Sequence, residues 1–443
     1  MRQTTGITGL SALCVLMALG GCTAGPDGVS RSPFNALGLG KSDPAPAADA
    51  PALDPQTPDG TASEVIGGLL TRRSVLEDGA YTRVADAVLA ANARAAEADL
   101  RAATLRAEAR SKNWLPTLGP QVSLTSLGTV VASLVVEQVI FDNGRKKAER
   151  AYAKADVEVA AVALAQDTND RVMDALTLYL AAQTAEARAA VNANAMAEME
   201  HFAWVMDERV KGGVSNRVDQ LVVQQKLNQM QADMSSDLEA AAAARSELAA
   251  MSAAPLDGVS GLSGLRPELT AAPLAVVKAE AEASRTVAEA KAARAGFLPG
   301  ITAVGSVSDG NSDIGLTAGA EQGIGFGTGA ALAAADQMAA GADARVAQVR
   351  EDANRSLRAL EGELASLRRQ QAQADTLAAG ADENYRIFAA QQKAGQRSVN
   401  DVVGVFETAV RLRRDAAALP FDVARVELRI AALRGVLVDG DKI

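Results

Sequence analysis

The sequence predicts a mainly α protein with a small β part, built from two copies of one large module. Residues 144–254 contain no proline, and a second long run from Phe326 meets none before Pro420. Each run follows a short segment of alternating apolar and polar residues, which in turn follows a Leu-Pro pair. Since proline ends a helix and alternation is typical of strands, each copy is expected to contain long helices and one β-hairpin.

An internal duplication is the second indication of this fold. Three pairs of markers recur in one order, 183, 185 and 182 residues apart: Pro116 and Pro299, Phe141 and Phe326, and Asp219 and Asp401. Spacing this regular indicates a repeated unit. The period is too long for a solenoid repeat, so we expect two copies of one module.

Composition narrows the class of function. Of the 443 residues 48% are apolar but only 3% are aromatic, which suits close packing of Ala-rich helices. The net charge is −10, and no basic stripe with interleaved aromatics occurs, which argues against nucleic-acid binding. With one histidine, His201, and two cysteines, the chain offers no material for a zinc site or a Ser-His-Asp triad. We therefore expect no enzyme, no metal and no cofactor, and interpret His201 as a packing or surface residue.

The N-terminus is typical of a secreted lipoprotein. Residues 1–21 have the pattern of a signal peptide, and Leu19-Gly20-Gly21-Cys22 is similar to a lipobox, which predicts lipidation of Cys22. The alternative is a plain signal peptide with an incidental cysteine. Residues 22–75 are expected to form the lipidated end and a tether, flexible from Thr23 to about Ala62, with residues 63–75 left open.

The first module is predicted over residues 76–254. A helix is expected from Tyr81 to Trp114, strands over 117–140 with a turn at 126–128, and a helix over 144–211 started by Asp142 or Asn143. The segment 211–213 contains two glycines that interrupt the helix, and a return helix is expected to run to about Met251.

The second module is predicted over residues 273–443, after a linker at 255–272. A hairpin with its turn at 309–312 is followed by a helix over 330–393, a break at Gly395, a cap at Ser398 and a helix through Arg434, with a kink expected at Pro420. Strands of about 8–10 residues match what a barrel strand needs to cross a bilayer, whereas the alternative is an ordinary soluble hairpin.

Together these features resemble the TolC-like outer-membrane efflux proteins over about residues 76–437. The resemblance is carried by Leu115-Pro116, Phe141-Asp142-Asn143-Gly144-Arg145, Leu298-Pro299, Phe326-Gly327-Thr328-Gly329 and the two tips that end at Asp219 and Asp401. The lipobox is similar to that of the lipoprotein branch of the family.

The resemblance implies a homotrimer in which each protomer gives four strands to one 12-stranded outer-membrane β-barrel. The paired long helices would form a periplasmic α-barrel. The implied function is a passive exit duct for drugs or secreted proteins, in a tripartite efflux pump or a type I secretion system. Its implied partners are outer-membrane lipid, a periplasmic adaptor and an inner-membrane transporter.

The resemblance also implies two sites at the tips. Asp401 would line the aperture and Arg397 would latch neighbouring helices, while Gly404 replaces a second aperture acid. The alternative for Asp401 is an acid that stabilises a helix start. The adaptor-contact tips would be Gly213, Val214, Ser215 and Asn216, and Gly395, Gln396, Arg397 and Ser398, although simple turn chemistry also explains these residues.

Two alternatives belong to other classes of function. A coiled-coil structural lipoprotein without a pore would lack membrane strands. No pair of acids and no metal-ligand spacing in the sequence indicates an enzyme. The Gly-rich segment 323–329 lacks the Lys of a phosphate-binding loop.

Overall fold

A computed structural model describes Leu53 and residues 62–91, 95–124, 130–266, 271–308, 311–323 and 325–443. Its elements run in the following order: α1 Glu64–Leu70, α2 Ala80–Ala90, α3 Ala95–Ser111, β1 Thr117–Leu124, β2 Val130–Phe141, α4 Arg145–Lys211, α5 Arg217–Met251, α6 Leu274–Gly296, β3 Gly300–Ser308, β4 Asn311–Gly319, α7 Thr328–Lys393, α8 Val399–Leu433 and a 3₁₀ turn Gly440–Lys442. The expected class, mainly α with paired long helices and four antiparallel strands, is confirmed.

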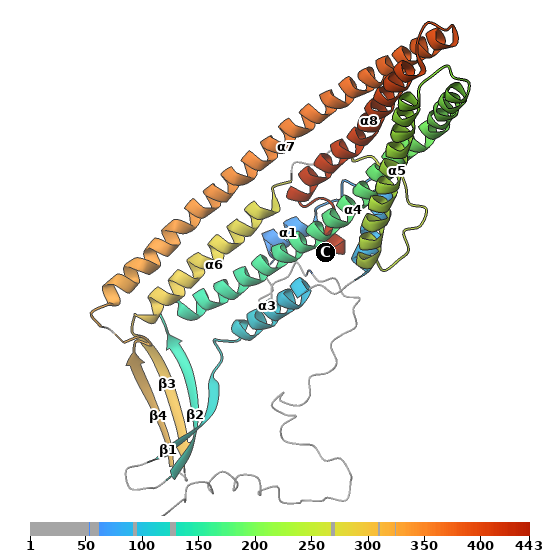
Figure 1. Ribbon diagram of the computed structural model, residues 1–443. Helices are drawn as coiled ribbons and strands as arrows, with labels where there is room; N and C mark the ends of the chain where they lie inside the picture. Colours follow the sequence, from blue (N-terminus) through green and yellow to red (C-terminus); the bar gives the residue numbers. More distant parts are fainter. Residues whose placement is uncertain are drawn as a thin grey trace, which may run out of the picture. The chain divides into compact units, whose positions relative to one another are not determined.

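The four strands form one antiparallel sheet in the order β1-β2-β3-β4 (Figure 1). β1 and β2 are the hairpin of the first copy, and β3 and β4 are the hairpin of the second. The copies join where β2 pairs with β3, from Ser133 opposite Ser308 to Phe141 opposite Ile301, with one irregularity between Val139 and Phe141. The duplicated modules therefore share a single sheet, with β1 and β4 at its edges.

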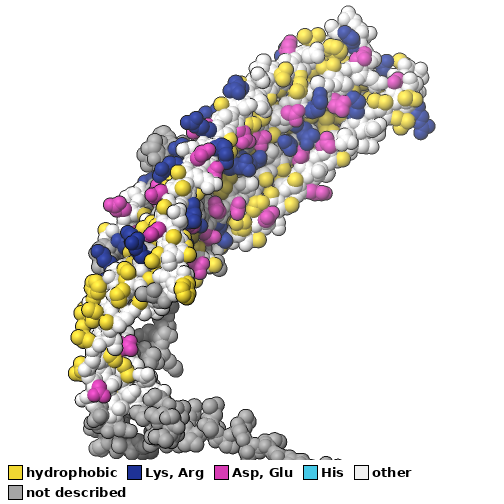
Figure 2. Space-filling view, turned by 90° about the vertical axis from the view of Figure 1, so that its left-hand side faces the viewer, with side chains coloured by type: hydrophobic (Ala, Val, Ile, Leu, Met, Phe, Trp, Pro, Cys, Tyr) yellow, Lys and Arg dark blue, Asp and Glu magenta, His cyan; other side chains and the backbone are white. Residues whose placement is uncertain are grey.

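Four helices continue these strands in the same lateral order. α3 leads into β1, β2 into α4, α6 into β3 and β4 into α7. The packed helix pairs are α3 with α4, α4 with α6 and α6 with α7, as Figure 1 shows. Because the connections are short, the order of the helices copies that of the strands. On the face in Figure 2, Lys and Arg side chains lie over the helices, whereas the strand end carries mainly hydrophobic ones.

Further from the sheet, the same layer is continued by different helices. α4 packs against α5 and α8, and α8 packs against α7. α5 therefore takes the place that α3 has near the strands, and α8 takes the place of α6. With 67 residues, α4 spans about 100 Å at 1.5 Å per residue, and α7 has 66 residues. Two long helices thus run unbroken from the strands to the tips.

The expected single helix from Tyr81 to Trp114 is wrong, because the structure divides it into α2 and α3. Ala91 leaves the helical conformation with ψ 68°. The guanidinium of Arg171 on α4 donates hydrogen bonds to the carbonyls of Val88 and Ala91 at 3.3 and 3.1 Å. The amide of Ala253 donates to the carbonyl of Ala87 at 3.0 Å. These distant donors satisfy the last carbonyls of α2, so no further helical turn is needed.

The start of α4 also differs in detail from the expectation. Gly144 occupies the cap position with φ 81°, and its lack of a Cβ makes this conformation inexpensive. Asp142 still serves the helix start, since its carboxylate accepts from the amides of Gly144 at 3.1 Å and Lys146 at 2.7 Å. The capping chemistry was predicted correctly, but its geometry is a turn that ends in glycine.

Residues 63–75, which the sequence left open, form α1 and join the main core. Ser63 caps α1 by accepting from the amide of Ile66. The amide of Val75 donates to the carbonyl of Val436 at 2.9 Å, and the amide of Arg266 donates to the carbonyl of Val75 at 2.7 Å. These backbone hydrogen bonds connect the N-terminal segment to both the linker between the copies and the C-terminal segment.

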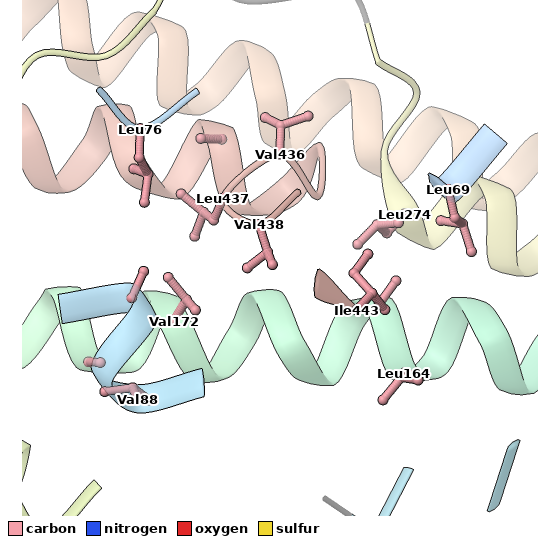
Figure 3. Close-up of a cluster of buried hydrophobic side chains, with 14 of the residues drawn as sticks. Leu69, Leu76, Val88, Leu164, Val172, Leu274, Val436, Leu437, Val438 and Ile443 are labelled. Carbon is pink, nitrogen blue, oxygen red and sulfur yellow. The ribbon is translucent and has the colours of Figure 1, made fainter. Parts of the chain in front are cut away.

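The main core lies where these three segments meet the middle of α4. In Figure 3 the C-terminal side chains Leu437, Val438 and Ile443 lie beside α4, from which Leu164 and Val172 contribute. All five side chains are buried. Cys22, the signal peptide and the turns at 126–128 and 309–310 lie outside the described residues.

Candidate functional site

The two helical tips have the same backbone geometry. Gly213 and Gly395 adopt φ values of +73° and +74°, a region that favours glycine. The amides of Val214 and Gln396 each donate back to a carbonyl five residues earlier, at 2.9 Å. The duplication seen in the sequence is therefore a duplicated turn in space, with a glycine at the equivalent position of each copy.

The return helices begin with equivalent caps. Asn216 accepts from the amide of Asp219 at 2.8 Å through its side-chain oxygen. Ser398 accepts from the amide of Asp401 at 3.1 Å, and the carboxylate of Asp401 accepts from the amide of Ser398 at 3.2 Å. This reciprocal pair is a capping box, and it confirms the expected cap at Ser398.

In each tip, one side chain closes the turn by a hydrogen bond to a side chain six residues away. Arg209 donates from Nε to Oγ of Ser215 at 3.2 Å. In the second tip, Arg397 donates from Nε to Oε1 of Gln391 at 3.0 Å, so donor and acceptor have exchanged positions. Arg397 also lies over the ring of Phe388, with 4.5 Å from Cζ to the centroid. Within one protomer, Arg397 is thus held against its own hairpin.

The two tips are joined to each other. The amide group of Asn400 donates to the carboxylate of Asp219 at 2.8 Å, and Lys226 on α5 pairs with Glu407 on α8. Further along, Arg414 on α8 reaches Asp233 at 3.3 Å and Asp237 at 2.6 Å on α5. Beneath these polar links lies a second core of twelve residues: Ala195, Met199, Phe202, Met206, Val223, Leu227, Met230, Val399, Val402, Val403, Phe406 and Val410.

The two equivalent acids differ in environment. Asp401 is exposed, and the hydroxyl and amide of Ser398, together with the charge of Arg397, hold the pKa of Asp401 below its ordinary value. Asp219 is half-buried and accepts the hydrogen bond from Asn400. The structure brings all the predicted tip residues to the two turns. Sequence reasoning missed Asn400 and Arg414, because their partners lie in the other copy.

The second candidate surface is one face of the sheet. Register places Leu118, Val136, Gly305 and Ile314 in one row across the four strands. Leu118, Val122, Ile314 and Leu316 are 60%, 65%, 91% and 71% exposed. An apolar band this continuous is unusual on a surface in contact with water and marks a site that meets lipid or a partner.

The opposite face of the same sheet is mostly polar. It is built from alternate residues of every strand. Its apolar members include Val135, Val139 and Val304, and its polar ones include Thr117, Gln121, Ser133, Glu137, Thr302, Ser306, Asp313 and Thr317. The sheet is therefore amphipathic across its whole width, as a strand wall between lipid and water requires.

Large aromatic side chains mark the joins between strands and helices. Trp114 precedes β1, Phe141 ends β2 and Phe326 precedes α7, and they are 60%, 53% and 114% exposed. Aromatic residues gather where a membrane protein crosses from lipid to water. The base of the apolar face is therefore marked by exposed aromatic side chains.

Two other features, a metal site and a membrane-spanning helix, have no support in the described part of the chain. No group of three or more His, Cys, Asp or Glu residues there could hold a metal ion. Within the same described ranges, no helix is long and apolar enough to cross a membrane.

Comparison with known proteins identifies the fold. No protein-family model matches the chain, and no curated protein matches its sequence. Among solved structures, a membrane protein from Pseudomonas aeruginosa is similar with a TM-score of 0.72 and 18% identity, over 83% of this chain and 92% of that one. The outer membrane protein VceC from Vibrio cholerae gives 0.68 and 14%, over 81% and 96%. The Campylobacter jejuni outer membrane channel CmeC gives 0.68 and 12%, over 83% and 89%.

These similarities extend over nearly the whole length of the solved structures, at sequence identities that report on fold alone. They match the arrangement described above, with duplicated long helical hairpins that continue into one four-stranded antiparallel sheet. The chain therefore has the TolC-like fold that is found in bacterial outer-membrane channels.

Proposed function

We propose that the protein is a trimeric outer-membrane channel, the passive exit duct of a tripartite efflux pump or a type I secretion system. Three protomers would each contribute the four-stranded sheet to one 12-stranded barrel, and the long helices would form a tunnel in the periplasm. Drugs or secreted proteins would leave through it, delivered by an inner-membrane transporter and a periplasmic adaptor that contacts the tips.

The amphipathic sheet is the observation that carries this proposal. Its apolar face is exposed in the single chain, and β1 and β4 have no strand partner on their outer sides among the described residues. Four strands cannot close a barrel alone, since single-chain barrels begin at about eight strands. Pairing β1 of one copy with β4 of the next would remove both open edges and leave the apolar face toward lipid.

The helices support a tunnel rather than a compact domain. α4 and α7 are each about 100 Å long, several times the radius of a compact domain of this size. The tips at their far ends would form the aperture, with Asp401 exposed at the second tip. Gly213–Asn216 and Gly395–Ser398 would contact the adaptor. Cys22 would carry a lipid anchor in the outer membrane.

The proposal is tested by purifying the full-length protein in detergent and recording planar bilayers after reconstitution. We expect a trimer by native mass spectrometry, a trimer band on an unheated gel that collapses on boiling, and stepwise conductance. A stable folded monomer without conductance would contradict the proposal and favour a structural lipoprotein without a pore.

A further inference from the structure

The part of the chain that contains the strands carries acids and no bases. Residues 113–144 and 295–344 hold no Lys or Arg, in a sequence that has 44 of them. The acids in these two segments are Glu137, Asp142, Asp309, Asp313, Glu321, Asp336 and Asp343. Both copies show this imbalance, and both segments surround a β-hairpin.

Three acids of this group that lie near the ends of helices have partners. Glu321 forms an ion pair with Arg145, and Asp336 pairs with Arg294 at 3.0 Å. The carboxylate of Asp142 accepts two backbone amides at the start of α4. The bases just beyond the acidic segments thus neutralise the acids nearest to them.

Glu137 and Asp313, the charged residues of the described strands, are different. Glu137 lies opposite Val304, and Asp313 lies opposite Ser306, two residues further along β3. Both belong to the polar face, both are exposed, and neither has an ion-pair partner among the described residues. The offset of two residues separates their levels by about 7 Å along the strand direction.

Register therefore determines which side these charges occupy. A shift of one residue would have placed Glu137 or Asp313 among the apolar side chains, where an unpaired carboxylate is strongly disfavoured. In the barrel of the proposed function, their face lines the water-filled interior. Three protomers would build two acidic levels there, and no Lys or Arg belongs to the strands to offset them.

We propose that this acid-only wall makes the strand sector selective for charge, with Glu137 and Asp313 as the specificity-determining residues. The inference rests on the proposed channel function and adds a substrate class to it. Fixed acids that line an aqueous passage with low-dielectric walls raise the local concentration of cations and lower that of anions. The cargo that fits is a cationic or neutral small molecule, and polyanions are disfavoured.

The test is the K⁺/Cl⁻ permeability ratio of the reconstituted full-length protein, measured from the reversal potential in a KCl gradient. Glu137→Gln combined with Asp313→Asn is expected to lower the ratio about fivefold at 0.1 M salt, from charges roughly 7–10 Å from the permeating ion. Ser133→Ala lies on the same face without a change of charge and is expected to leave the ratio unaltered.

The outcomes separate the two proposals. Absence of conductance in the unmodified protein would overturn the channel itself. Conductance with an unchanged ratio in the double variant would overturn only the role of the strand wall and leave the tips as the source of selectivity. If the double variant does not assemble, Ser306→Lys provides the same test by adding a base next to Asp313, and an unchanged ratio in that variant would equally reject the inference.

Discussion

Arg414→Met is expected to loosen the contact between the two helical hairpins near the tips. Arg414 on α8 holds two acids on α5, Asp237 at 2.6 Å and Asp233 at 3.3 Å. Methionine keeps the unbranched side chain but removes the charge and both hydrogen bonds. The two carboxylates, one helical turn apart, would then repel each other without a counter-charge.

The size of this destabilisation follows from the distances and exposures of the three side chains. Hydrogen bonds to charged groups contribute about 1.5–3 kcal/mol each. Asp237 is the larger contributor, since its side chain is 15% exposed and that of Arg414 is 22% exposed. The bond to Asp233 is longer and its side chain is 37% exposed, so solvent weakens it. We expect a loss of about 2–3 kcal/mol in the free energy of opening α5 from α8.

Hydrogen exchange measured by mass spectrometry reports this free energy directly. Since each 1.4 kcal/mol is a factor of ten, amides over residues 227–241 of α5 are expected to exchange about 30- to 140-fold faster in Arg414→Met. Arg386→Met is the matched control, because the side chain of Arg386 is 75% exposed and its ion-pair partner among the described residues is Glu383 on its own helix. If both variants exchange alike, the link between the hairpins does not depend on Arg414.

Three further predictions concern the N-terminus and the tips. Mass spectrometry of the mature protein is expected to find a lipid on Cys22, and an unmodified cysteine or cleavage elsewhere would reject the anchor. In planar bilayers, Asp401→Ala is expected to lower cation selectivity and Arg397→Ala to raise conductance, whereas Asp219→Ala should change neither much. Equal effects of the two Asp variants would show that Asp401 is not the acid that lines the aperture. Ser398 lowers the folded-state pKa of Asp401 from 3.8, so the capping contribution of Asp401 is complete above pH 3.8 and is lost as the pH falls through the lower folded value. Amide exchange in the first turn of α8 is therefore expected to rise only below pH 3.8. The absence of such a rise would contradict the capping role.

Local chemistry made much of the fold predictable from sequence. Strands were expected over 117–140 and are found at 117–124 and 130–141, because alternation and a preceding Leu-Pro pair are properties of the segment itself. The tips at Gly213 and Gly395 were predictable for the same reason, since a glycine with positive φ followed by a capping residue ends one helix and begins the next.

Features that depend on distant segments could not be predicted. The carbonyls at the end of α2 are satisfied by distant groups, among them Arg171, which lies 80 residues further along the chain than Ala91. The bond from Asn400 to Asp219 spans 181 residues and exists only because the two copies pack side by side. Alternation within single strands was visible in the sequence, but only the pairing register shows that the apolar residues of all four strands share one face.

Closure of the barrel between copies tests the central claim most directly. β1 and β4 are three strand spacings apart within one sheet, about 14 Å, which is beyond the reach of a short cross-linker. With Leu118→Cys and Leu316→Cys combined, a short bis-maleimide applied to the detergent-solubilised protein is therefore expected to join different copies, with covalent dimers and trimers and nothing larger on a denaturing gel. Each single variant should give no trimer. A monomer as the sole product, or a ladder that continues beyond three copies, would contradict a closed trimeric channel.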